Sequence, residues 1–100
     1  MPRLHWTPKA SEDLDGIKRY IAEDDPEAAV RTVLDIIERA ERLREFPESG
    51  PLLREKRWPN DAMRFLTVGS YLVFYVADDA FVSVIRVLHA ARDYMRVLHQ

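Results

Sequence analysis

Apolar residues in the first quarter of the chain recur at the spacing of a helix. They stand at intervals of four, three and four residues, which places them on one stripe of a helical surface. Thr7 can cap the free N–H groups, and Pro8 suits the first helical position, where its missing N–H costs nothing. This pattern predicts a helix from Pro8 to about Glu23. Its apolar stripe is Ala10, Leu14, Ile17 and Ile21.

A second helix is predicted directly after the first. Asp24, Asp25 and Pro26 repeat the pattern of a cap followed by proline, and Pro47 and Gly50 mark its end. About twenty residues at ~1.5 Å each give a rod of roughly 30 Å. The short link predicts a helical hairpin with one shared seam. The stripe of the second helix is Ala29, Val33, Ile36, Ile37, Ala40, Leu43 and Phe46.

The rest of the chain has the alternating pattern of strands. Residues 3–6 (RLHW) predict one short strand, and three more are predicted at 62–68, 71–77 and 80–89. Gly69-Ser70 and Asp78-Asp79 fit two-residue hairpin turns. Residues 47–61, which hold three of the six prolines, predict a loop. The expected fold is therefore α+β: an N-terminal strand, a helical hairpin and a three-stranded antiparallel meander, in one domain over residues 1–100.

Two-residue turns fix a register, and the register separates two faces of the sheet. Val68 then opposes Tyr71, Leu66 opposes Val73 and Arg64 opposes Tyr75, whereas the next hairpin pairs Tyr75 with Val82 and Tyr71 with Arg86. The almost purely apolar face is predicted to pack on the helices. It comprises Met63, Phe65, Leu72, Phe74, Val76, Phe81, Ile85 and Val87. The mixed face comprises Arg64, Leu66, Val68, Tyr71, Val73, Tyr75, Val82, Val84 and Arg86.

The mixed face predicts a protein partner. Tyrosine and arginine are enriched where interfaces hold most of their energy, and a contiguous apolar patch is uncommon on a monomer. The candidate partner-binding residues are Arg64, Tyr71, Tyr75 and Arg86. The alternative is that these side chains only solvate an open sheet face.

Composition and charge narrow the classes of function. The chain is 47% hydrophobic and 32% charged, as expected for one globular core, and it has no cysteine for a disulfide or a thiolate. Its longest apolar run is far short of the ~20 residues of a membrane helix, and no signal-peptide core is visible, so a cytoplasmic location is expected. A net charge of −2 gives no cationic field and argues against direct nucleic-acid binding.

The chain also offers polar side chains at the end of the last strand. His89 could act as an acid or base at neutral pH, but its place on the strand favours a hydrogen-bonded residue that closes the strand. Arg92 and Asp93 could form a site or only a local ion pair. Arg92 and the segment from Tyr94 to Gln100 are further candidates for target contact. The loop cluster Arg54, Lys56, Arg57 and Trp58 could stack on a base or grip a phosphate, or it could remain solvated. Nothing in the spacing of His5 and His99 suggests a metal, and no cofactor is expected.

Four motifs, in order, resemble the RelE/ParE superfamily of type II toxin–antitoxin toxins, and more closely its ParE branch. They are WTPKASEDLDGIKRYIAEDDPEAA, LREFPESG, GSYLVFYV and VIRVLHAARD. The resemblance implies a small toxin neutralised in a hetero-oligomer by a co-expressed antitoxin, whose C-terminal helix and strand wrap it. RelE-like members cut messenger RNA on the ribosome, whereas ParE-like members inhibit DNA gyrase.

The residues favour the gyrase branch. Cleavage of RNA through its 2′-hydroxyl needs a base, an acid and cations on the phosphate. Arg64 and Arg92 resemble two basic positions of the RelE pattern, but Leu72 stands where a strand arginine is expected and Leu98 where a late tyrosine is. The expectation is a gyrase inhibitor that acts by binding and has no catalytic residues. The alternatives are a ribosome-dependent mRNA endoribonuclease using Arg64, His89 and Arg92, and a non-toxic antitoxin-binding module.

Overall fold

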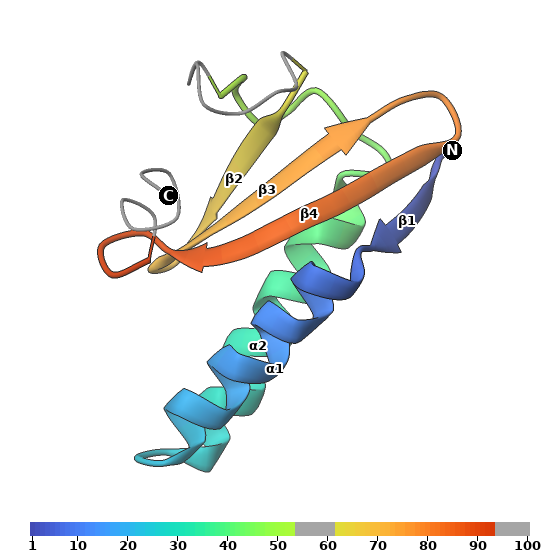
Figure 1. Ribbon diagram of the computed structural model, residues 1–100. Helices are drawn as coiled ribbons and strands as arrows, with labels where there is room; N and C mark the ends of the chain where they lie inside the picture. The colour runs from blue at the N-terminus through green and yellow to red at the C-terminus, as the bar shows by residue number, and fades with distance from the viewer. Residues whose placement is uncertain (54–61, 94–100) are drawn as a thin grey trace.

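The two predicted helices and four predicted strands are all present. The computed structural model describes residues 1–53 and 62–93, and Figure 1 shows the arrangement of the elements. In chain order they are β1 (Arg3–Trp6), α1 (Pro8–Ala22), α2 (Pro26–Arg42), β2 (Arg64–Val68), β3 (Tyr71–Ala77) and β4 (Phe81–His89). The predicted α+β class and order of elements are therefore confirmed.

The helix starts follow from the caps that the sequence contains. The Thr7 hydroxyl accepts the N–H of Ala10 at 3.1 Å and donates to the carbonyl of Ile85, so it ties the start of α1 to β4. The Asp25 carboxylate accepts the N–H of Ala28 at 3.1 Å. The end of α2 was predicted too late: the helix stops at Arg42, and Phe46 lies 63% exposed beyond it.

The sheet is mixed, and its strand order is β1-β4-β3-β2. The β2–β3 register is as predicted, with Arg64 opposite Tyr75 and Val68 opposite Tyr71. The meander is extended by β1, which pairs in parallel with β4, so the N-terminal strand becomes one edge of the sheet. This parallel pairing is possible because β1 and β4 are separated in the chain by the helical hairpin, β2 and β3, a connection long enough for parallel neighbours.

The predicted β3–β4 register is wrong. Asp78, Asp79 and Ala80 form a three-residue connection, in which the Asp78 carboxylate accepts the N–H groups of Ala80 and Phe81 at 2.8 Å. A register shift between Phe74 and Tyr75 then makes Tyr75 oppose Val84 and Tyr71 oppose His89. The shift leaves Ile85 without a partner, as in a β-bulge, so Ile85 and Val87 belong to different apolar clusters.

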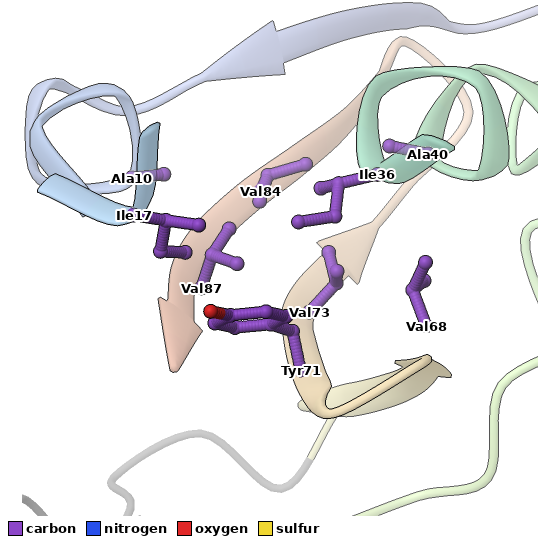
Figure 2. Packing of buried hydrophobic residues seen from close by; sticks show 9 residues of the cluster. All are labelled: Ala10, Ile17, Ile36, Ala40, Val68, Tyr71, Val73, Val84 and Val87. Atoms are coloured by element: carbon purple, nitrogen blue, oxygen red, sulfur yellow. The ribbon is translucent and has the colours of Figure 1, made fainter. Parts of the chain in front are cut away.

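The helices cover the face of the sheet that was predicted to be open. Figure 2 shows Tyr71, Val73, Val84 and Val87 directed at Ile17 of α1 and Ile36 of α2. The apolar set with Met63, Phe74 and Leu88 forms a second cluster, with Phe65, Leu72 and Ile85 packed against it. The predicted membership of each face was largely right, but the side covered by the helices was not.

The physical reason lies in side-chain size. Both faces are apolar enough to be buried, so hydrophobicity alone does not choose between them. The helices present alanines to the sheet, and the face that they cover is rich in valine. Small residues on both sides let the layers approach closely and pack without voids. The alanines that pack in one cluster with the valines of the sheet are Ala10 of α1 and Ala40 of α2.

Candidate functional site

Tyr75 fastens the segment after α2, residues 43–53, to the sheet. Its side chain is fully buried, and its hydroxyl donates to the carbonyl of Pro47 and accepts the N–H of Gly50, both at 2.9 Å. The guanidinium of Arg64 donates to the carbonyls of Gly50 at 2.8 Å and Glu48 at 3.3 Å. The segment then follows the edge of β2, where Leu53 donates its N–H to the carbonyl of Met63 at 2.7 Å.

A second cluster gathers where β4 ends beside the start of β3. Arg92 forms a two-pronged ion pair with Asp93, with N–O distances of 3.1 and 3.2 Å, and its guanidinium lies 4.5 Å from the centre of the Tyr20 ring. Tyr71 meets the ring of His89 edge-on, with 5.3 Å between the ring centres. We call Tyr20, Tyr71, His89, Arg92 and Asp93 the β4 corner. It borders a groove between α1 and β4.

His89 has a structural role in this corner. Its Nδ1 accepts the backbone N–H groups of Ala91 and Arg92, at 3.2 and 3.0 Å, so the ring holds the turn that follows β4. Nδ1 is therefore the acceptor for both N–H groups of this turn. The prediction of a hydrogen-bonded histidine that closes the strand is therefore confirmed in its geometry.

Arg92 is the exposed cation of the corner. Its side chain is 41% exposed, and the hydrogen bond to the Asp93 carboxylate raises the pKa of Arg92 above its ordinary value. The predicted local ion pair is present. Because a carboxylate already takes two of its N–H donors, a phosphate would have to compete with Asp93 for this guanidinium.

Arg86, three residues before His89 on β4, is bound by Asp13 of α1. The Asp13 carboxylate binds Arg86 through two hydrogen bonds, at 2.8 and 3.1 Å, and also accepts the N–H of Val87 at 3.0 Å. The two side chains are only 19% and 12% exposed. One acidic residue thus holds the helix, the arginine and the strand just after the bulge.

The structure corrects the predicted partner face. Tyr71 is 7% exposed and packs under the helices. Tyr75 is fully buried and is bound to the segment after α2, and Arg86 is bound by Asp13. These three side chains do not form an open sheet face, because that face is the one the helices cover. Arg64 is half-buried at the β2 end of the sheet, where it binds carbonyls of its own chain.

The three residues of the alternative nuclease are not brought together. Arg64 pairs with Tyr75 and His89 pairs with Tyr71, so they lie at positions four residues apart along β3. Four residues correspond to about 13 Å at ~3.3 Å each, and the Arg64 side chain is directed to Gly50 and Glu48. His89 and Arg92 do share the β4 corner. Among the described residues, no cluster of His, Asp or Glu could hold a metal ion.

Two predicted groups of residues lie outside the part of the chain that the structure describes. They are the loop cluster Arg54, Lys56, Arg57 and Trp58, and the segment from Tyr94 to Gln100.

Three residues that the structure shows to be important were missed in the sequence. Asp13 and Tyr20 resemble ordinary exposed helix positions there, and the signal for Gly50 was limited to its expected role in ending a helix.

The buried tyrosines predict a loss of stability in alkali. Burial raises the pKa of Tyr71 and Tyr75 above the ordinary value of 10.0. The unfolded chain therefore releases these protons first, so their contribution is intact below pH ~10 and is lost as the pH rises through the folded-state values. We expect the free energy of unfolding, measured with urea, to fall above pH ~10 and to fall less steeply in Y71F and Y75F. Equal slopes for these variants and for Y20F, a change at an exposed tyrosine, would contradict this expectation.

Comparison with known proteins assigns the fold to a class. The structure superimposes on a chain of the chromosomal ParDE toxin–antitoxin system of Pseudomonas aeruginosa with a TM-score of 0.71 and 26% identity, over 89% of this chain and 96% of that chain. It shares its fold with a chain of the RelBE2 toxin–antitoxin complex of Mycobacterium tuberculosis, at a TM-score of 0.61 and 23% identity, over 89% and 99% of the two chains. The molecule is thus a toxin of the RelE/ParE superfamily of type II toxin–antitoxin systems, as the sequence motifs predicted.

Sequence relatives narrow this class to a family. Toxin RelE2 of Caulobacter vibrioides is 35% identical over 96 residues, which cover 92% of this chain and 99% of the relative. A putative toxin of Sinorhizobium fredii, Y4kP, is 35% identical over 97 residues and 96% of each chain. Residues 4–94 match the family described as ParE toxin of type II toxin-antitoxin system, parDE. The chain belongs to this family.

Proposed function

We propose that this toxin acts in the cytoplasm, is neutralised by a cognate antitoxin in a hetero-oligomer, and inhibits DNA gyrase by binding when it is free. Membership of the ParE family and the likeness to a ParDE chain support this proposal. None of the helices in the described part of the chain is long and apolar enough to cross a membrane.

The observation that favours binding over catalysis is that the three candidate arginines are already bound by groups of this chain. A phosphate whose charge grows during cleavage needs preorganised donors that are free to receive it. Here Arg64 donates to backbone carbonyls, Arg86 is bound by Asp13 and Arg92 by Asp93. Leu72, at the position of the expected strand arginine, packs against the cluster of Phe74 and Leu88. This arrangement supports a toxin that acts through surface contacts.

Arg92 is our candidate for such a contact. It is exposed beside Tyr20, which is 59% exposed, and arginine and tyrosine are frequent where interfaces hold their energy. We expect R92A to weaken inhibition of the target by about tenfold or more, the loss of one strong interface residue. K9A, which removes an exposed cation at the start of α1, is the matched control and should leave inhibition unchanged.

The deciding experiment adds purified toxin to gyrase with supercoiled DNA and, separately, to translating ribosomes. Trapped cleavage complexes of gyrase, relieved by the antitoxin, are the expected result. Cuts in messenger RNA on the ribosome would overturn the gyrase target and establish the second candidate, an interferase of RelE type, which the name of the Caulobacter relative favours. Inactivity in both assays with antitoxin binding retained would identify a non-toxic binding module.

A further inference from the structure

The outer face of α2 carries apolar side chains that the fold leaves exposed. Val30, Leu34 and Ile37 are 46%, 58% and 37% exposed. They follow one another at intervals of four and three residues, so they form one narrow stripe along the helix. The inner stripe of the same helix, with Ala29, Ile36 and Ala40, is already used by the core. α2 is therefore apolar on two sides, and only one of them is covered by the described part of this chain.

Charged residues border the exposed stripe in an order that is complementary to itself. Along one flank stand Glu27, Arg31, Glu38 and Arg42, all of them exposed. At 3.6 residues per turn their spacing keeps them on one side of the apolar stripe. Glu27 and Arg42 lie equally far from the middle of the helix, and so do Arg31 and Glu38. Read in the reverse direction, every acid therefore takes the place of a base.

This symmetry indicates one kind of partner. In an antiparallel pair of identical helices related by a two-fold axis, the same flank of each helix faces its copy, and residue i meets residue j while j meets i. Glu27 would then face Arg42 of the copy, Arg31 would face Glu38, and Leu34 would pack against Leu34 on the axis. Charges that flank an apolar seam set partner choice and direction in paired helices.

We propose that the outer face of α2 is a self-association surface on which a second copy of this toxin docks in antiparallel fashion. Within one chain, Arg42 also pairs with Glu38 at 3.2 Å, and both side chains are about two-thirds exposed. The dimer adds Arg31 of the copy to the same carboxylate. The exposed stripe is short, so the dimer is small and dissociates readily, as interfaces at the low end of the size range do.

Sedimentation of the purified, antitoxin-free chain tests the proposal. We expect the mass to rise from 11.7 kDa toward twice that value with concentration, and L34E to abolish the rise. R31E should weaken the dimer about three- to tenfold by placing two carboxylates face to face, and R31E/E38R should restore it to within about twofold because the opposite charges are exchanged. R19E, an exposed charge reversal on α1, is the matched control and should leave the mass unchanged.

Three outcomes would overturn the proposal. One is a wild-type chain that stays monomeric up to ~1 mM, where a dimer of comparable dissociation constant would be half formed. Another is a dimer that L34E leaves intact. The third is a double variant no better than the single reversal, which would show that the charges do not meet across the axis. If the chain is monomeric and L34E weakens antitoxin binding instead, the stripe belongs to the antitoxin.

Discussion

Replacement of Asp13 by alanine is expected to lower the free energy of unfolding by about 2–4 kcal/mol. The change leaves the Arg86 guanidinium and the N–H of Val87 without the carboxylate that binds both, in a place where the two charged side chains are only 12% and 19% exposed. Breaking a buried pair from one side is costly because the remaining charge is left without compensation. Urea unfolding monitored by circular dichroism measures the loss.

Two further variants separate this effect from the general cost of a helix mutation. E12A removes the neighbouring carboxylate, which is 70% exposed and lies 3.5 Å from Lys9, and it should cost less than about 0.5 kcal/mol. The double variant D13A/R86A should cost less than the sum of its single variants, because the two residues act on one another. Additive losses would show that the pair contributes nothing as a pair.

The substitution G50A is expected to cost about 3 kcal/mol through overpacking and the loss of hydrogen bonds. A Cβ at Gly50 would clash with the carbonyl oxygen of Phe65 and would lie 2.7 Å from the hydroxyl of Tyr75. Neither atom can move freely, since one belongs to a strand and the other is buried and bonded to Pro47 and Gly50. Thermal and urea unfolding of the purified variant measure the change.

The two other glycines provide matched controls. Gly16 lies in α1 with nothing within 4 Å of an added Cβ, so G16A should stabilise the protein by about 0.5–1 kcal/mol through better helix propensity. Gly69 has equal space but a φ of +57°, and G69A should cost about 1 kcal/mol for the left-handed backbone alone. A G50A variant as stable as the wild type would mean that the segment after α2 is not fastened as closely as described.

The error over the faces of the sheet shows what alternation can reveal. Alternation correctly grouped Leu66, Val68 and Val73 on one face, because successive side chains of a strand point to opposite sides. It could not say which face the helices would cover, because both faces are apolar enough to be buried and a tyrosine can be buried when its hydroxyl is hydrogen-bonded. Tyr75 satisfies its hydroxyl with backbone groups of Pro47 and Gly50, so it is buried without penalty.

The candidate site was predictable in its local parts only. The ion pair of Arg92 with Asp93 joins adjacent residues, and the turn held by His89 spans four, so both follow from local geometry. The partners Tyr20 and Asp13 lie more than seventy positions away from Arg92 and Arg86. Only the packing of α1 against β4 brings them together.

The sequence by itself determined the elements, their order, the helix caps and the β2–β3 register, because these depend on periodicity, capping and a tight turn between near neighbours. The tertiary structure alone decided the parallel pairing of β1, the shifted register of β4, the face that the helices cover and the partners of the arginines. These features depend on contacts between distant segments, where side-chain volume and the need to pair every buried polar group select one arrangement among several that satisfy the local pattern.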